Sequence, residues 1–402
     1  MGRNYDMKNK DLIDRFIRYA KIDTQSSEES QTSPSTVKQH DLAKLLSSEL
    51  RAMGASDVYY DEEHCYVYAA VPGSQDKKPL GFIGHMDTSP AVSGADVKPR
   101  IIENYDGKDA LLKPDDFPEL KNHIGEDLIA SDGTTLLGAD DKAGVSEIMN
   151  MAKFYLEHKE TGHRTFKIAF TPDEEVGRGT EHFDIVRFGA EEAYTVDGGK
   201  LGLLEYENFN AASAHIIIRG KSVHPGDAKN LMINALLVGM EFNSMLPPAE
   251  TPSHTEMYEG FYFLEEMKGS TDSADMKYFI RDHDRTKFEA RKETVRKISA
   301  YMNEKYGEGT ITAEIEDQYF NMADLMASHM NLIDNAKAAM EKVGIKPLIL
   351  PIRGGTDGAV LTFRGLPCPN LCTGGYNYHG RYEYASIPEM EKTAELLIEL
   401  VK

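Results

Sequence analysis

Histidines and carboxylates gather in short clusters along this chain, and each cluster follows an apolar run. His85 and Asp87 end the run "GFIGHMD". Similar clusters stand in four further stretches: "GADDKAG" (138–144), "TPDEEVG" (171–177), "VDGG" (196–199) and "NYHGRYE" (377–383). Imidazole and carboxylate ligands without thiolate suit zinc and, less decisively, manganese or cobalt. The clusters therefore predict a metal site that activates water for hydrolysis.

Each cluster taken alone also has a purely structural interpretation. A single histidine at a strand end is more often a hydrogen-bonded structural residue than a ligand. The stretch "GADDKAG" is also typical of a helix N-terminus, where acidic residues favour the dipole, and "DEE" is also typical of a solvated turn. The clusters recur after successive strands and are flanked by glycine. This recurrence favours one shared site, because open α/β sheets build their sites at the ends of strands.

The spacing within two clusters suggests separate roles for neighbouring side chains. Glu174 and Glu175 are adjacent, and adjacent side chains of extended backbone point apart, so one can bind a metal while the other faces a water. His85 and Asp87 are two residues apart on a strand and point the same way. Asp87 is therefore predicted to accept a hydrogen bond from the imidazole and to fix its tautomer.

The elements that must position these side chains alternate between helix and strand in the first half of the chain. Short buried strands are predicted at "CYVYAAV", "PLGFIG", "TFKIAF" and "EAYTV". Apolar residues at helical spacing predict one helix before them and one after "LLGAD": Leu42, Leu45, Leu46, Leu50 and Met53, then Ile148, Met149, Ala152, Tyr155 and Leu156. This order predicts a layered α/β domain.

From about Asn210 the pattern changes to a βαββαβ order typical of a ferredoxin-like module. Its predicted elements are "AHIIIRG", "NLMINALLVGMEFNSML", "GFYFLEEM", "DMKYFIRDH", a charged helix to Tyr306 and "TITAEIE". The α/β pattern then resumes with a helix near 322–343, the strand "PLILPI" and a last helix from Pro388. We therefore expect a discontinuous catalytic domain, 1–209 with 320–402, and an inserted domain, 210–319.

Charge and cysteine content restrict the partners and the compartment. The 402 residues include 66 Asp and Glu against 45 Lys and Arg, a formal charge of −21. This charge repels phosphate backbones and anionic membranes, so neither nucleic acid nor a membrane is expected as a partner. Three cysteines, an odd number, do not suggest a disulfide framework. With no signal-peptide pattern in "MGRNYDMKNKDLIDRF" and no membrane-spanning apolar run, we expect a cytoplasmic protein.

Six motifs carry a resemblance to a known family: "GHMDT", "LLGADDKAG", "FTPDEEVG", "RGKSVHPG", "PIRGGTDGA" and "TGGYNYHGRYE". They resemble the co-catalytic zinc metallopeptidases, which include aminopeptidases, carboxypeptidases, aminoacylases and succinyl-diaminopimelate desuccinylase. The likeness runs from about residue 10 to the C-terminus, and the longer strings are most similar to tripeptide aminopeptidases. It implies a mixed-sheet zinc-peptidase catalytic domain with an inserted ferredoxin-like lid and dimerisation domain.

The resemblance also implies a ligand set for two zinc ions per subunit. His85, Asp140 and Asp197 would hold one ion. Asp140, Glu175 and His379 would hold the other, with Asp140 bridging the two. Asp140 is the first Asp of the D-x-K pattern, which makes Asp141 the weaker candidate.

Catalytic and substrate-binding roles follow from the same resemblance. Glu174 would be the general base, Asp87 would support His85, and His224 would stabilise the tetrahedral oxyanion when the lid closes. From the sequence alone, a turn histidine before a proline is an equally good interpretation of His224.

Two arginines are candidates for binding the C-terminal carboxylate of the peptide. Arg281 in "FIRDHD" and Arg353 in "RGGTDG" carry guanidinium groups, which pair with carboxylates in a bidentate manner. A structural ion pair is the alternative for each.

The expected function is that of a cytoplasmic dizinc aminopeptidase that releases the N-terminal residue from tripeptides and dimerises through the lid. Two alternatives remain. The same metal site would serve a carboxypeptidase or an N-acyl amino acid amidohydrolase. Alternatively, the chain is a non-catalytic relative that binds peptides. The presence of Glu174 and of all five ligands argues against this alternative.

Overall fold

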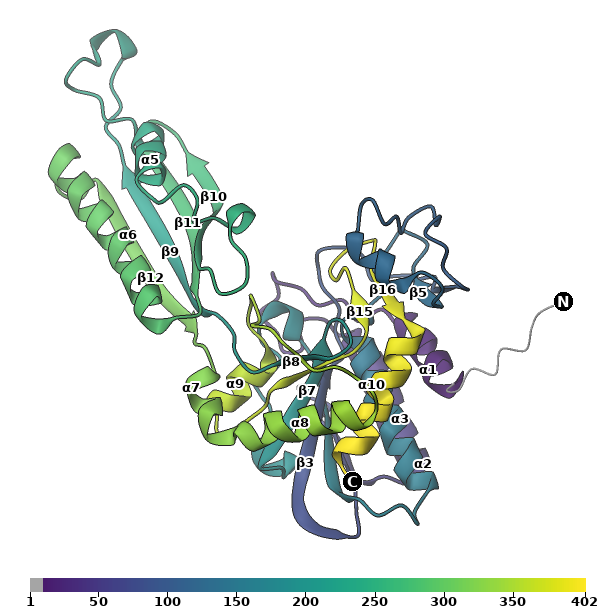
Figure 1. Ribbon diagram of the computed structural model, residues 1–402. Helices are drawn as coiled ribbons and strands as arrows, with labels where there is room; N and C mark the ends of the chain where they lie inside the picture. The colour runs from purple at the N-terminus through teal and green to yellow at the C-terminus, as the bar shows by residue number, and fades with distance from the viewer. Residues whose placement is uncertain (1–9) are drawn as a thin grey trace. The chain divides into compact units, whose positions relative to one another are not determined.

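The computed structural model describes residues 10–402. Residues 1–9 lie outside the described residues. They belong to the N-terminal stretch in which we expect no signal peptide. The chain divides into two compact units (Figure 1). The first comprises the chain up to Tyr206 together with Asp324–Leu350 and Thr356–Lys402, and the second comprises Glu207–Ala323 and Pro351–Gly355. The structure thus groups 351–355 with the second unit, whereas the sequence-based division, which stays a prediction, assigned them to the first.

A large mixed sheet forms the centre of the first unit and confirms the mixed α/β prediction. Its strand order is β1-β2-β6-β3-β7-β14-β8-β13. β3 pairs in parallel with both β6 and β7, and its stretch Gly81–His85 is buried, as expected of a strand covered on both faces. The strands are β1 (Ser56–Tyr60), β2 (Val67–Val71), β3 (Gln75–His85), β6 (Arg164–Thr171), β7 (Glu192–Gly198), β8 (Leu203–Glu205), β13 (Leu348–Ile349) and β14 (Asn370–Cys372).

Helices of the first unit pack on this sheet and on one another. α3 lies against β3 and β7 and also contacts α1 and α10, with Phe16, Ala143 and Met390 in their common core. The helices are α1 (Lys10–Ala20), α2 (Gln39–Met53), α3 (Ala139–Glu157), α4 (Ile185–Phe188), α7 (Ala323–Met326), α8 (Met330–Lys342), α9 (Asp357–Phe363) and α10 (Ile387–Leu400). In the described part of the chain, no helix is both long and apolar enough to cross a bilayer.

Two elements differ from the sequence-based expectation. The helix predicted near 322–343 is divided into α7 and α8 by a 3-10 turn at Ala327–His329, where Ser328 and His329 have only moderate helix propensity. The strand predicted at "PLILPI" is limited to Leu348–Ile349. Pro347 and Pro351 flank it, and proline cannot donate a ladder hydrogen bond.

A small second sheet in the first unit was not predicted. It is antiparallel, in the order β15-β16-β5-β4. Its strands are β4 (Arg100–Ile102), β5 (Leu128–Ala130), β15 (Gly375–Tyr376) and β16 (Tyr384–Ser386). Strands of two or three residues are too short to show a period in the sequence. The connection from β15 to β16 carries His379 and ends at Glu383.

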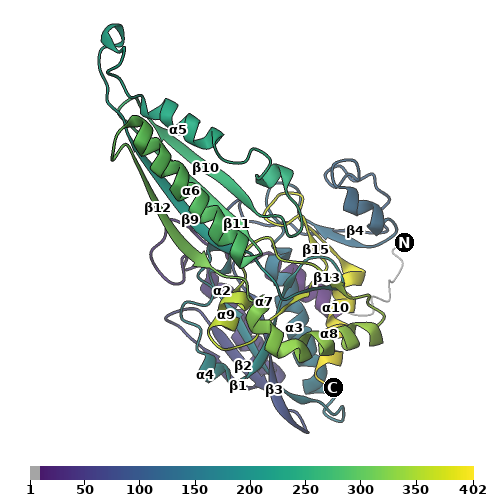
Figure 2. The ribbon, with the colours of Figure 1, turned by 60° about the vertical axis from the view of Figure 1, so that its left-hand side comes forward.

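The second unit confirms the predicted βαββαβ module. Its antiparallel sheet has the order β10-β11-β9-β12, and Figure 2 shows its two helices together on one face. Residues of β11 alternate between exposed and buried, and the buried ones pack with Phe242 and Phe288 of the helices. The elements are β9 (Asn210–Arg219), α5 (Ala235–Ser244), β10 (Phe261–Gly269), β11 (Ser273–Asp282), α6 (Arg285–Tyr306) and β12 (Ile311–Tyr319).

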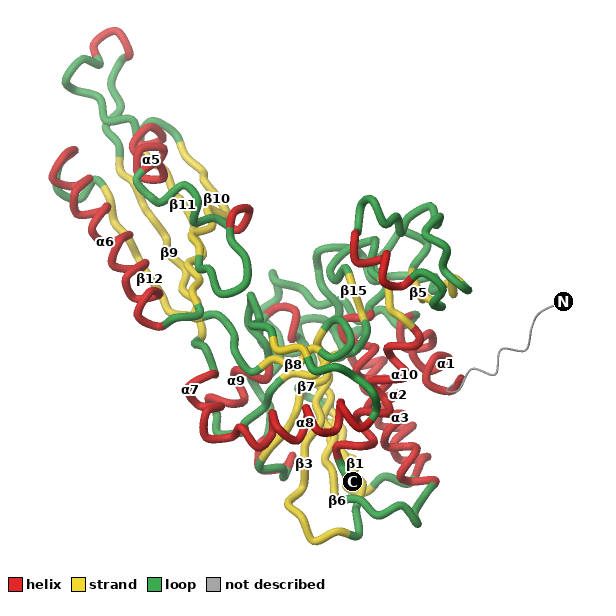
Figure 3. The backbone as a smooth tube through the Cα atoms, viewed as in Figure 1, coloured by secondary structure: helices red, strands yellow, loops and turns green. Residues whose placement is uncertain are grey.

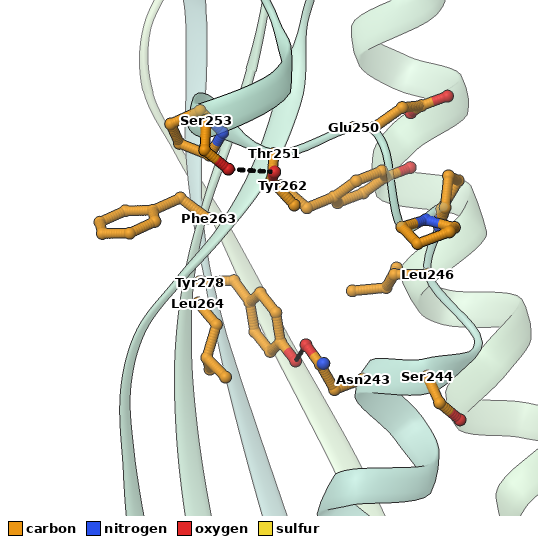
Figure 4. Close-up of a pocket in the computed structure, with 13 residues that line it drawn as sticks. Asn243, Ser244, Leu246, Glu250, Thr251, Ser253, Tyr262, Phe263, Leu264 and Tyr278 are labelled. Atoms are coloured by element: carbon orange, nitrogen blue, oxygen red, sulfur yellow. Dashed lines mark hydrogen bonds between the residues drawn. The ribbon is translucent and has the colours of Figure 1, made fainter.

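Two loops of the second unit, one before α5 and one after it, connect this helix to its sheet. The connection from β9 to α5, a loop interrupted by the 3-10 turn Pro225–Asp227 (Figure 3), contains His224. The connection from α5 to β10 borders a cavity of about 540 Å³. In this cavity the Tyr278 hydroxyl donates to Asn243 Oδ1 at 3.0 Å (Figure 4). The predicted site residues are not among those that line it.

Candidate active site

The central strands bring three of the predicted clusters to one edge of the large sheet. β3 ends at His85, opposite Thr171 at the end of β6, and β7 carries Asp197 near its own end. Because the three strands are parallel, their carboxyl ends meet. α3 brings Asp140 to the same place. A Cβ on Gly144 would lie 1.8 Å from the Val196 carbonyl oxygen, so only glycine lets α3 approach β7 this closely.

The Asp140 carboxylate lies between two histidines. Its Oδ1 is 2.8 Å from His85 Nε2, and its Oδ2 is 3.2 Å from His379 Nε2. Asp197 Oδ1 lies 3.3 Å from the same His85 nitrogen, and Glu175 Oε2 lies 2.9 Å from the same His379 nitrogen. The five side chains therefore form two overlapping groups of three that share Asp140.

Asp87 connects the first histidine to the turn that carries the two glutamates. His85 Nδ1 lies 3.1 Å from the Asp87 carbonyl oxygen and 3.3 Å from its Oδ1. This nitrogen is placed to donate, so Nε2 faces Asp140. The Asp87 carboxylate also accepts from the main-chain N–H groups of Glu174 and Glu175, at 3.0 and 3.2 Å. Asp87 is fully buried, and it fixes the end of β3 and this turn together.

The turn itself differs from the extended backbone that the sequence argument assumed. Glu174–Val176 is a 3-10 turn, and Asp173 before it has a left-handed backbone with φ +54°. Asp173 accepts from the main-chain N–H of Ser35 at 2.6 Å and from Gln39 Nε2 at 2.7 Å. The loop that precedes α2 is thus fixed to the turn of the two glutamates.

Several carboxylates lie close together in the buried cluster, and burial and mutual repulsion shift their pKa values. Burial and repulsion from Asp140 raise the pKa of Asp197 to about 6 and that of Glu175 to about 7. Burial, then repulsion from Asp197, also raises the pKa of Glu174. Hydrogen bonds to Asp140 and Glu175 raise the pKa of His379 to about 11. A positive charge placed among these oxygens would relieve the repulsion.

Two observations show that the side chains suit divalent cations. Donor atoms of His85, Asp140 and Glu175 lie within 4.8 Å of one another. Glu175 Oε1 is buried and has no hydrogen-bond partner among residues 10–402, although a buried carboxylate oxygen normally has one. Two imidazoles with three carboxylates form a donor set suited to zinc.

Asp141 is also close, with donor atoms that group with those of His85 and Asp197. Its two oxygens, however, accept from main-chain N–H groups, those of His85 and Gly144, both at 3.1 Å. This carboxylate therefore holds the start of α3 against β3. Asp140 remains the better candidate for the shared ligand.

Sequence reasoning missed two buried acids beside the cluster. Asp357, at the start of α9, accepts from the Thr171 hydroxyl at 3.0 Å, and burial raises its pKa to about 7. Glu383 accepts from main-chain N–H groups just before and at Asp140. Both stand in motifs quoted above, "PIRGGTDGA" and "NYHGRYE", so a carboxylate that shortly follows a glycine was the available signal.

The remaining predicted residues lie in the second unit. The His224 side chain is exposed, and its Nδ1 accepts from the Gly226 N–H at 3.1 Å. Arg281 donates to the Ala212 and Ile280 carbonyl oxygens and to Gln318. Arg353 donates to carbonyl oxygens of the loop 255–259. These contacts anchor both arginines within the second unit, and their roles toward a substrate stay predictions.

A cavity of about 520 Å³ in the first unit adjoins the cluster. Glu175 and His379 line it on one side, and the loop before α2 contributes Glu28 and Glu29. The remaining lining residues are Gln25, Ser26, Ser27, Ser89, Pro90 and Ala91. A molecule in this cavity would contact both the candidate metal ligands and an acidic loop.

Known proteins resemble this chain over nearly its whole length. A family model described as the peptidase dimerisation domain matches residues 206–310. Peptidase T of Desulfitobacterium hafniense (strain DSM 10664 / DCB-2) is 53% identical, covering 97% of both chains. Peptidase T of Alkaliphilus oremlandii (strain OhILAs) is 49% identical, covering 98% of this chain and 99% of its own. The crystal structure of aminopeptidase PepT from Bacillus cereus shares the fold, with a TM-score of 0.77 at 24% identity and 98% coverage of both chains. The chain therefore belongs to the peptidase T family.

Proposed function

We propose that this chain is a metal-dependent aminopeptidase that releases the N-terminal residue of tripeptides. The observation that carries the proposal is the Asp140 carboxylate, whose two oxygens face His85 and His379 in two overlapping donor groups. Its close relatives are named peptidase T, and a protein of the same fold is described as an aminopeptidase.

We propose two zinc ions per subunit as the resident metal. His85, Asp140 and Asp197 would hold one ion, and Asp140, Glu175 and His379 would hold the other. When bound, such a pair lowers the pKa of a shared water and polarises the scissile carbonyl.

The protein's own carboxylates then handle the proton. Glu174, the predicted general base, takes the proton of the attacking water and gives it to the leaving amine. Asp87 contacts both the Glu174 N–H and the His85 imidazole. It therefore fixes the position of the base relative to the ligand. An oxyanion-stabilising role for His224 and carboxylate binding by Arg281 and Arg353 stay predictions.

The acidic cavity beside the cluster supports an aminopeptidase over the alternatives. Glu28 and Glu29 line the same cavity as Glu175 and His379. Carboxylates there attract the α-ammonium group of a free peptide and repel a free carboxylate. An N-acyl amidohydrolase, whose substrate carries no α-ammonium group, would gain nothing from such a lining, and the C-terminal carboxylate that a carboxypeptidase must bind would be repelled from it.

We also propose a homodimer in the cytoplasm. The match to a dimerisation domain over 206–310 supports the dimer. The free, buried thiols of Cys65, Cys368 and Cys372 suit a reducing compartment.

The test is hydrolysis of a free tripeptide, its N-acetylated form and the matching dipeptide, with and without chelator. Cleavage of the free tripeptide alone, lost with chelator and restored by zinc, is expected. Cleavage of the acetylated peptide would favour the carboxypeptidase or amidohydrolase alternative. Absence of cleavage with every metal would favour a peptide-binding relative.

A further inference from the structure

Glu383 is a buried carboxylate that binds the loop leading to Asp140. It lies four residues after His379, immediately before β16, with a relative exposure of 1%. Its Oε2 accepts from the main-chain N–H groups of Leu137 and Gly138, at 2.7 and 2.8 Å. Its Oε1 accepts from the N–H of Asp140 itself at 3.0 Å. One side chain therefore satisfies three main-chain donors at the start of α3.

These contacts join two segments that are distant in sequence. The acceptor lies 243 residues after Asp140 along the chain. The segment that carries Glu383 also carries His379, whose imidazole lies 3.2 Å from the Asp140 carboxylate. The hydrogen bonds from Glu383 thus fix the backbone of one candidate ligand relative to the segment that bears another.

The carboxylate is the side chain that this arrangement requires. A carboxylate accepts at both oxygens, whereas an amide accepts at one oxygen and directs N–H groups from the other end. A glutamine here would leave at least one main-chain donor facing another donor. The first turn of a helix also favours a negative charge.

We propose that Glu383 is a positioning residue that sets the geometry of the Asp140 and His379 ligands and so raises the affinity of the site for metal. Because Asp140 belongs to both donor groups, loss of Glu383 weakens the binding of both ions. Outer partners that orient ligands typically change metal affinity by about 10- to 100-fold. The proposal rests on the metal centre proposed above, but not on the identity of the peptide substrate.

The test is metal binding by the full-length protein without substrate. Isothermal titration calorimetry of the metal-free protein with zinc should give a dissociation constant about 10- to 100-fold higher for Glu383→Gln than for the wild type. The cobalt-loaded variant should show an altered visible absorption spectrum, which a merely structural role would not change. Circular dichroism and thermal unfolding of the metal-free proteins establish that the folds are equal.

A matched control is Glu126, which precedes β5 of the small sheet as Glu383 precedes β16. Glu126 accepts from Ser386 of β16 at 2.8 Å and lies 2.7 Å from His123 Nδ1. Glu126→Gln should leave zinc affinity and the cobalt spectrum as in the wild type. If Glu383→Gln does not fold, Glu383→Asp keeps the charge and shortens the reach, and a folded Glu383→Asp protein should also bind zinc more weakly. Wild-type zinc affinity in a folded variant at position 383 would overturn the proposal, whether or not the protein cleaves peptides.

Discussion

Replacement of Glu205 by glutamine should make the protein more stable at alkaline pH and leave its stability unchanged in acid. Glu205, at the end of β8, is buried and accepts from Asn370 Nδ2 at 2.9 Å. Asn370 in turn accepts from the Asp197 N–H and the Thr195 hydroxyl. Glu205 therefore supports, through Asn370, the hydrogen bond that holds the backbone of the candidate ligand Asp197. A glutamine keeps its hydrogen bond but cannot ionise.

The magnitude follows from the pKa. Burial, against the hydrogen bond from Asn370, raises the pKa of Glu205 from 4.5 to about 7. The folded protein therefore binds the Glu205 proton more tightly than the unfolded chain does. The contribution of this proton to the free energy of unfolding is complete below pH 4.5 and is lost as the pH rises through 7. Each pH unit between the two pKa values corresponds to about 1.4 kcal/mol. The free energy of unfolding of the variant should therefore exceed that of the wild type by about 3 kcal/mol at pH 8.

Urea unfolding of both proteins at pH 4.5 and pH 8, in chelator, measures this difference. The other titrating groups are common to the two proteins and cancel when one is subtracted from the other. A difference that is the same at both pH values, or one that favours the wild type at pH 8, would refute the reasoning about Glu205.

Three further predictions concern acidic side chains of the first unit. Glu174→Gln should abolish peptide hydrolysis while zinc content, measured by elemental analysis, stays near that of the wild type; loss of zinc would mean that Glu174 is a ligand. Glu147, in α3, is buried, and neither of its oxygens has a hydrogen-bond partner in the described part of the chain, so Glu147→Met should raise the free energy of unfolding by about 1–3 kcal/mol. An unchanged or lower value would indicate a partner for that carboxyl. Glu28→Gln combined with Glu29→Gln should raise KM for free tripeptides several-fold with kcat little changed, and an unaltered KM would remove the acidic loop from substrate binding.

The sequence predicted the parts of the site that depend on strand ends. His85 and Asp87 could be identified because a buried apolar run ended in polar residues two apart, and the parallel strands bring their ends to one edge. The βαββαβ module was predicted because its strands and helices are long enough to show their periods.

Other parts of the site could not be predicted in this way. The choice of Asp140 over Asp141 came from family resemblance, because the two residues are adjacent and both acidic. The structure distinguishes them, since the Asp141 oxygens accept from main-chain N–H groups. Glu383 acts on the backbone of a loop 243 residues away. Its motif marks the residue, but no spacing in the sequence predicts which backbone groups it contacts. The turn at Glu174–Val176 depends on hydrogen bonds of Asp87 and Asp173. These bonds join segments that are distant in the sequence, so local patterns do not predict the turn.

The central claim is that Asp140 is shared by two metal ions, and metal stoichiometry tests it most directly. Elemental analysis after zinc loading and removal of free metal should give two zinc ions per subunit in the wild type. Glu175→Ala should lose one ion and Asp140→Ala should lose both. A wild-type protein with one ion or none, or an Asp140→Ala protein that keeps both, would contradict the account.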